Sequence, residues 1–61
     1  MNTEVENLEI ELERELEAKG FADAIICFTD LRTVAVTINL NTKYFYYDIW
    51  LVDKVISAFR L

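Results

Sequence analysis

The sequence predicts an α+β fold, in which the elements follow the order α-β-β-β-α and a three-stranded antiparallel sheet is covered on one face by two helices. Apolar residues recur at spacings of three and four near both ends of the chain, which is typical of amphipathic helices. Between these segments the spacing changes to two, with only short polar interruptions, which indicates an antiparallel meander. A chain of 61 residues has room for one such domain, which we expect to span residues 1–61.

The N-terminal helix has a start signal and a stop signal. Thr3 followed by Glu6 fits a capping box, in which the two residues satisfy the first free backbone N–H groups of a helix. Gly20 favours a helix end. The apolar stripe between these signals is narrow and consists of Val5, Leu8, Leu12 and Leu16. We therefore expect this helix to pack by one edge, with Ile10 and Arg14 facing away from the core.

Three strands follow, in segments rich in β-branched and aromatic residues. We expect them at residues 24–29, 33–40 and 43–47, joined by residues 30–32 and by a turn at Asn41 and Thr42. The second strand alternates cleanly, and its expected buried face consists of Val34, Val36, Ile38 and Leu40. For the first strand the sequence does not decide which face is buried, because both sets of alternating residues are apolar. One set is Ile25 with Cys27, and the other is Ala24, Ile26 and Phe28.

The C-terminal helix is expected to begin directly after Asp48, whose carboxylate suits an N-cap, and to run for about 12 residues. Its broad apolar arc makes it the main cover of the sheet. The arc consists of Ile49, Val52, Val55, Ile56 and Phe59, extended by Leu51 and Ala58. Trp50 falls on the polar side, so we expect this large aromatic side chain to be partly exposed.

Negative charge is concentrated in the first third of the chain. Residues 1–20 carry seven glutamates against Arg14 and Lys19, a net charge of −5, whereas residues 21–61 carry four acidic and four basic residues. One flank of the first helix carries Glu6, Glu9, Glu13 and Glu17. Carboxylates repeating about every 6 Å along a helix can imitate nucleic acid phosphates. Such a ladder favours a protein partner with a basic surface and disfavours direct contact with nucleic acid.

The residue inventory argues against an enzyme. The chain has no His, and a single Gly rules out a glycine-rich phosphate loop. Cys27 has no His to act as a base, so we expect it to be a small core residue and not a nucleophile. The glutamates do not follow a calcium-loop pattern, and we expect neither a metal nor a cofactor. One cysteine, no signal peptide and no long apolar run indicate the cytosol, with no membrane partner.

Aromatic residues suggest a second surface. If Phe45 and Tyr47 point to the core, alternation places Tyr44 and Tyr46 on the outer face of the sheet. Exposed Tyr and Trp side chains are common anchors of protein interfaces. The alternative interpretation is therefore an oligomerisation module, a homodimer formed through the open sheet face or through Trp50. In that case the glutamates favour the helix and keep the protein in solution.

The nine residues from Val52 to Arg60, VDKVISAFR, resemble the helix that follows the sheet in type II-A anti-CRISPR proteins, the small acidic phage proteins that inhibit Cas9. The layout is similar to this family over nearly the whole chain. The resemblance implies a phage-encoded protein in the host cytosol that occupies the basic site where Cas9 reads the protospacer-adjacent motif. Asn41 and Thr42 stand where the family carries acidic residues, so the binding residues are predicted from charge and exposure instead.

Eight residues form the predicted partner-binding site of a non-enzymatic acidic protein that acts as a DNA mimic. Glu6, Glu9, Glu13 and Glu17 form the ladder, Asp23 and Asp30 extend it, and Tyr44 and Tyr46 supply apolar anchors.

Overall fold

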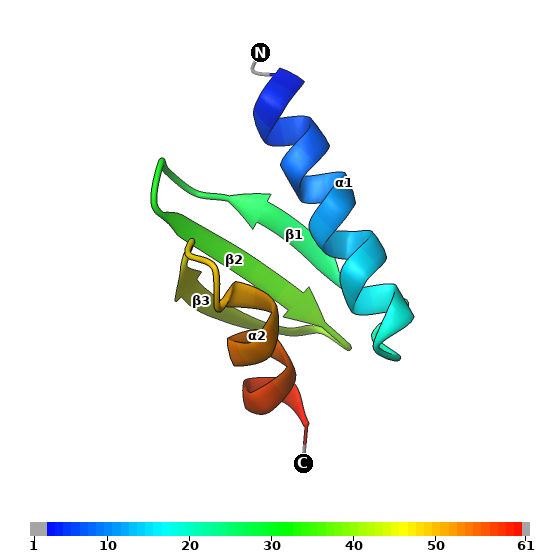
Figure 1. Cartoon of the computed structure of the whole chain (residues 1–61). Coiled ribbons are helices and arrows are strands. Elements are labelled where there is room, and N and C mark those ends of the chain that lie inside the picture. Colours follow the sequence, from blue (N-terminus) through cyan, green and yellow to red (C-terminus); the bar gives the residue numbers. More distant parts are fainter. Residues whose placement is uncertain (1–2, 61) are drawn as a thin grey trace.

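The computed structural model describes residues 3–60 and confirms the predicted fold class. Its elements are α1 (Thr3–Ala18), β1 (Ile25–Phe28), β2 (Thr33–Ile38), β3 (Asn41–Tyr46) and α2 (Leu51–Phe59). The strands form one antiparallel sheet in the order β1-β2-β3, so β1 and β3 are its two edges. α1 lies beside β1, and α2 lies beside β3 (Figure 1).

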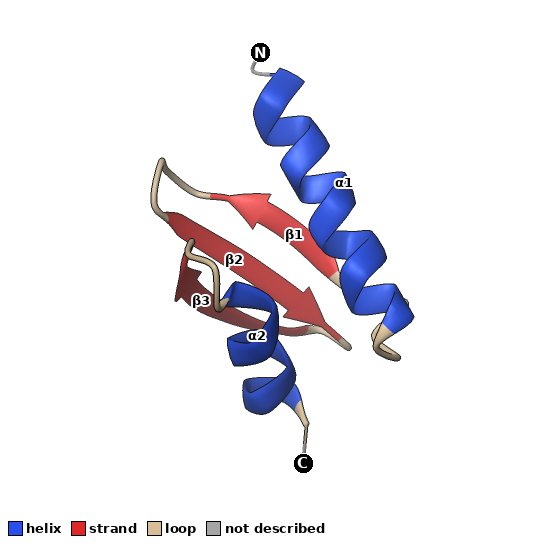
Figure 2. Ribbon diagram, in the orientation of Figure 1, coloured by secondary structure: helices blue, strands red, loops and turns tan. Residues whose placement is uncertain are grey.

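Both helices cover the same face of the sheet, and no helix of residues 3–60 lies on the other face (Figure 2). The core lies between the helices and the covered face, where Val34 and Val36 of β2 are fully buried. Leu16 of α1 and Val55 of α2 pack against them from the two helices. The burial of these side chains supplies the main favourable free energy of folding.

The alternation of β1 selects one of its two apolar sets for the core. Ile26 is buried and Phe28 is half-buried against the core, whereas Ile25 and Cys27 are exposed on the uncovered face. The expectation that Cys27 is a core residue is therefore wrong. Its side chain leaves the core because successive residues of a strand point to opposite faces and only one face is covered.

The turn between β2 and β3 lies two residues earlier than predicted. Ile38 pairs with Asn41, so Asn39 and Leu40 form a two-residue turn and Asn41 already belongs to β3. The φ angles of the turn residues are 53° and 69°, which is the left-handed pair of a type I′ turn. Asn tolerates this conformation and Leu rarely adopts it. The side chain of Leu40 is 96% exposed, so its place in the predicted buried face is wrong.

α1 ends as the sequence predicts. Gly20 has a φ of 101°, which residues with a Cβ rarely adopt. The N–H of Phe21 donates to the carbonyl of Leu16 (2.8 Å), and the N–H of Gly20 donates to that of Glu17 (3.0 Å), the two bonds of a Schellman motif. At its other end α1 already includes Thr3, which is therefore not the N-cap that a capping box at Thr3 and Glu6 implies.

α2 begins at Leu51, two residues later than predicted, and spans 9 residues. Asp48 is not its N-cap, because the cap position is Trp50. Ile49 therefore lies before the helix and is 87% exposed, whereas Leu51 is 2% exposed. The predicted places of Ile49 in the main apolar arc and of Leu51 at its margin are reversed. Trp50 is exposed, as predicted.

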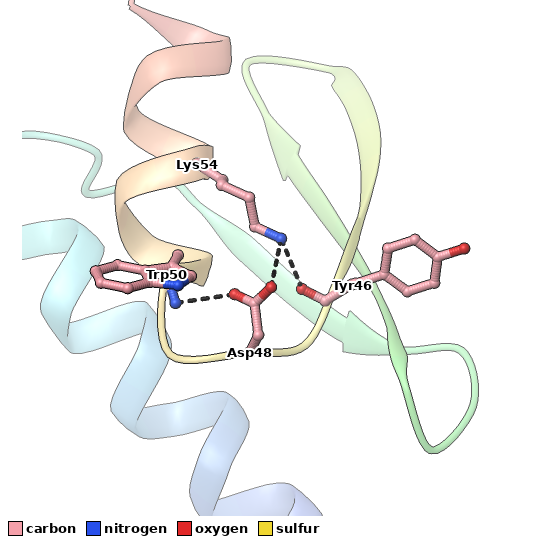
Figure 3. A network of polar contacts seen from close by, with 4 residues as sticks. All are labelled: Tyr46, Asp48, Trp50 and Lys54. Atoms are coloured by element: carbon pink, nitrogen blue, oxygen red, sulfur yellow. Dashed lines mark hydrogen bonds and ion pairs between the residues drawn. The ribbon is translucent and has the colours of Figure 1, made fainter.

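Asp48 nevertheless organises the start of α2. Its Oδ1 accepts a hydrogen bond from the backbone N–H of Trp50 (2.8 Å), and its Oδ2 pairs with Nζ of Lys54 (2.9 Å; Figure 3). The same Nζ donates to the carbonyl of Tyr46 at the end of β3 (3.3 Å). The hydrogen bond from Lys54 is the largest cause that lowers the pKa of Asp48 below its ordinary value of 3.8.

Candidate protein-interaction surfaces

Two of the predicted ladder residues are hydrogen-bonded to the edge of the sheet. Oε2 of Glu9 accepts a bond from the backbone N–H of Phe28 (3.1 Å), and Oε2 of Glu13 accepts one from that of Ile26 (3.3 Å). Both glutamates are half-buried. Because β1 is an edge strand, these N–H groups have no strand partner on that side. Glu9 and Glu13 therefore accept two of the free N–H groups at the edge of β1, a role that their positions in the sequence did not predict.

The spacing of helix and strand explains this pairing. Four residues of an α-helix rise about 6 Å. Two residues of a strand rise about 6.7 Å, and every second N–H points to the same edge. A helix lying along an edge strand can therefore place carboxylates four residues apart opposite N–H groups two residues apart. The order of the bonds, Glu9 with Phe28 and Glu13 with Ile26, shows that α1 and β1 run in opposite directions.

The other glutamates of α1 lie mainly on its solvent side. We define the acidic face as the exposed residues Glu6, Ile10, Glu11, Arg14, Glu15 and Glu17. Ile10 and Arg14 are exposed, as predicted. At about 100° per residue, Ile10 lies between Glu6 and Glu17 on one side and Glu11 on the other. Beside Ile10 the surface has a hollow of about 310 Å³, whose lining is Ile10, Glu13, Arg14, Glu17 and Ala22.

The two predicted extensions of the ladder lie outside α1, in the connections before and after β1. Asp23 is exposed in the connection between α1 and β1. Asp30 is exposed in the β1–β2 turn, where its Oδ1 accepts the backbone N–H groups of Arg32 (2.7 Å) and Thr33 (2.8 Å). These two bonds, with that from Arg32 the larger cause, lower the pKa of Asp30 below its ordinary value of 3.8. The carboxylate of Asp30 thus shapes its own turn.

Tyr44 and Tyr46 lie on the uncovered face of the sheet, as the alternation predicts. They are 67% and 72% exposed, whereas Phe45 between them packs against the core. We define the open sheet face as Ile25, Cys27, Thr33, Ala35, Thr37, Thr42, Tyr44 and Tyr46. A hollow of about 280 Å³ lies at its β3 side, and its lining is Thr33, Tyr44, Phe45 and Tyr46.

The fold does not unite the predicted site residues into one surface. α1 packs on the covered face beside β1, whereas Tyr44 and Tyr46 belong to the opposite edge strand and point from the opposite face. The molecule therefore has two separate candidate surfaces. The role of Glu9 and Glu13 has a signal in the sequence, since a pair of carboxylates four residues apart borders the apolar stripe at Leu12 and Leu16. That signal identifies an edge-strand contact only once the neighbour of α1 is known.

Within residues 3–60, no three Cys, Asp or Glu side chains are grouped so that they could hold a metal ion. Neither described helix is long and apolar enough to cross a membrane. Both surfaces carry exposed apolar side chains, which are common anchors of protein interfaces: Ile10 lies among carboxylates on the acidic face, and Tyr44 and Tyr46 lie on the uncharged open sheet face. No protein-family model matches the chain, and neither a curated protein nor a solved structure shows significant similarity to it.

Proposed function

We propose that this protein is a non-enzymatic binding protein that docks the acidic face of α1 on a basic surface of another protein. One observation carries the proposal. Glu6, Glu11, Glu15 and Glu17 are exposed on the solvent side of α1, as is Ile10, whereas Glu9 and Glu13 are bonded to the edge of the sheet. The fold thus presents a rigid helical face with an apolar residue among carboxylates. Interfaces commonly place an apolar anchor inside a polar rim, which is the arrangement that this face offers.

The charge of the acidic face defines the partner. Residues 1–20 account for a net charge of −5, and the rest of the chain is neutral overall. A strongly negative helix is attracted to basic protein surfaces and repelled by nucleic acid phosphates. Surfaces that bind nucleic acid are much more positively charged than ordinary protein–protein interfaces. We therefore propose a target surface that otherwise holds nucleic acid, and the channel of Cas9 is the specific target to test.

The test measures whether the purified protein prevents guide-loaded Cas9 from binding its target DNA, across several Cas9 orthologues. We expect the protein to inhibit DNA binding by at least one Cas9 orthologue at physiological salt. The inhibition should weaken when the ionic strength is raised, because salt screens the attraction between the charges. A variant with Glu6→Gln, Glu11→Gln, Glu15→Gln and Glu17→Gln should lose most of the inhibition. Circular dichroism checks that this variant folds. Absence of inhibition with every orthologue contradicts the Cas9 target, and inhibition that survives the four substitutions contradicts the acidic face as the docking surface.

A further inference from the structure

We infer that the open sheet face is a docking site for a second copy of this chain. This inference is independent of the proposed function, because the open sheet face and the acidic face lie on different sides of the molecule. The dimer would cover the uncovered face of each sheet and leave both acidic faces outside.

The charge of the face favours a second copy as the occupant. All eight residues of the open sheet face are uncharged, although the chain as a whole has a net charge of −5. Two copies can therefore meet there without placing like charges in contact. A strongly basic or acidic partner would find no countercharge on this face, and its own charges would lose their hydration there without compensation.

The sizes of the side chains on the open sheet face allow two copies of this face to fit together. The register places Cys27, Ala35 and Tyr44 on one rung across the sheet. The tall tyrosine thus stands at the β3 edge, the short cysteine at the β1 edge, and a small alanine between them. A two-fold rotation about an axis along β2 sets Tyr44 of one copy against Cys27 of the other, with the two Ala35 residues, which are only 8% exposed in the single chain, opposite each other between them. Sulfur in contact with an aromatic ring is itself favourable.

The next rung shows the same match. Ile25, Thr37 and Thr42 lie side by side across the three strands, with the large side chain now at the β1 edge. The same two-fold rotation sets Ile25 of one copy against Thr42 of the other. Ile25 is 61% exposed in the single chain, so it would gain an apolar neighbour. Large residues thus face small ones on both rungs, which is the condition for two sheets to pack closely.

The area of the face sets the strength of the dimer. A fully buried Tyr removes roughly 150–250 Å² from water. At their exposures of 67% and 72%, Tyr44 and Tyr46 offer roughly 200–350 Å² in each copy. With the other six residues of the open sheet face included, the surface area buried by the two copies together stays below about 1,200 Å². Interfaces of this size are typical of transient complexes. We therefore expect a dissociation constant between about 1 µM and about 1 mM.

Cys27 provides the test, because it is the chain's single cysteine, it is exposed, and it belongs to the open sheet face. The experiment measures its rate of alkylation by iodoacetamide from about 1 µM to about 1 mM protein, the range of the expected dissociation constant. Sedimentation equilibrium on the same samples measures the mass, and a phosphine reductant prevents disulfide formation. We expect the alkylation rate to fall severalfold as the mass rises towards that of a dimer. Added salt should leave the dimer intact, in contrast to the acidic-face contact.

Two double variants separate this face from other exposed apolar residues. Tyr44→Thr with Tyr46→Thr introduces β-branched residues, which favour strands, and should yield a monomer whose alkylation rate is independent of concentration. Leu31→Thr with Ile49→Thr removes two exposed apolar side chains outside the face and should leave the dimer unchanged. The inference is overturned if the wild type stays monomeric up to about 1 mM. It is equally overturned if the chain associates while the alkylation of Cys27 is unaffected, or if association survives the tyrosine substitutions.

Discussion

Glu9 and Phe28 lie 19 residues apart in the sequence, and the carboxylate of Glu9 accepts the backbone N–H of Phe28 at 3.1 Å. Glu13 makes the corresponding contact with Ile26 one helical turn further on. Edge strands expose rows of unpaired N–H groups that can template unwanted strand pairing. In this protein two side chains of a neighbouring helix occupy that row. α1 thus packs its apolar stripe into the core, and the glutamates beside that stripe bind the edge of the sheet.

Removing these acceptors should destabilise the protein. We expect Glu9→Ala and Glu13→Ala each to lower the free energy of unfolding by about 1 kcal/mol, because each leaves a half-buried backbone N–H without its acceptor. Urea denaturation measures the change. Glu11→Ala is a control of equal charge, since Glu11 is exposed. It should be neutral or slightly stabilising, because Ala favours helix and one like-charge pair with Glu15 is lost. Equal losses at Glu9 and Glu11 would contradict the edge contact.

The turn at Asn39 and Leu40 offers a stabilising substitution. Leu40 has a φ of 69° and gains almost no burial, so the strain of its backbone is not compensated by packing. We expect Leu40→Gly to raise the free energy of unfolding by about 0.5–1 kcal/mol, since Asn-Gly is the preferred pair of a type I′ turn. Leu31 is an equally exposed leucine without a positive φ. Leu31→Gly should destabilise through the added freedom of the unfolded chain. A Leu40→Gly variant with a lower midpoint temperature of unfolding than the wild type would contradict the turn geometry.

The start of α2 can be located by a pair of truncations. Leu51 lies in the core cluster, and Leu51→Ala should cost about 2–5 kcal/mol because it leaves a cavity. That loss is comparable to the whole stability expected of so small a domain. Ile49 is exposed, and Ile49→Ala should change the stability by less than about 0.5 kcal/mol. Thermal denaturation by circular dichroism distinguishes the two. A large loss at Ile49 with a small one at Leu51 would favour the helix start that the sequence pattern indicates.

Asp48 should make the stability sensitive to acid. Its pKa in the folded protein is lowered, chiefly by Lys54, so the unfolded chain binds more protons than the folded chain near and below pH 3.8. The stabilisation is therefore present above that pH and is lost as the pH falls through the lowered pKa. Asp48→Asn should reduce the urea midpoint at neutral pH and reduce it much less in acid. A difference between wild type and variant that is constant with pH would show that the charge of Asp48 contributes nothing.

Local patterns predicted much of the fold. Three features were predicted correctly because they depend only on residues close together in the sequence. They are the burial of Leu12 and Leu16, the helix end at Gly20 and the inward position of Phe45. The misplaced elements depend on information from elsewhere in the chain. Leu40 continues the apolar alternation of β2, yet the register with β3 turns the chain before it. Ile49 fits the apolar arc of a helix, yet α2 begins only at Leu51, after a loop in which Asp48 accepts the N–H of Trp50.

The candidate site shows the same division. Sequence placed the exposed tyrosines on the outer face, because alternation alone decides it. It did not distinguish Glu9 and Glu13 from Glu6 and Glu17, because that distinction requires knowing that α1 lies against β1. Cys27 was misplaced for a related reason, since either set of residues in β1 was apolar enough for the core.

The most direct test of the proposed docking role compares two variants of equal charge in the assay for DNA binding by guide-loaded Cas9. Glu11→Gln with Glu15→Gln alters the acidic face, and Glu9→Gln with Glu13→Gln alters the edge contact while an amide oxygen still accepts each backbone N–H. The proposal predicts that the concentration for half-maximal inhibition rises at least about tenfold for the first variant, equivalent to about 1.4 kcal/mol, and changes little for the second. Equal effects of the two variants, or no inhibition by the wild type, would contradict it.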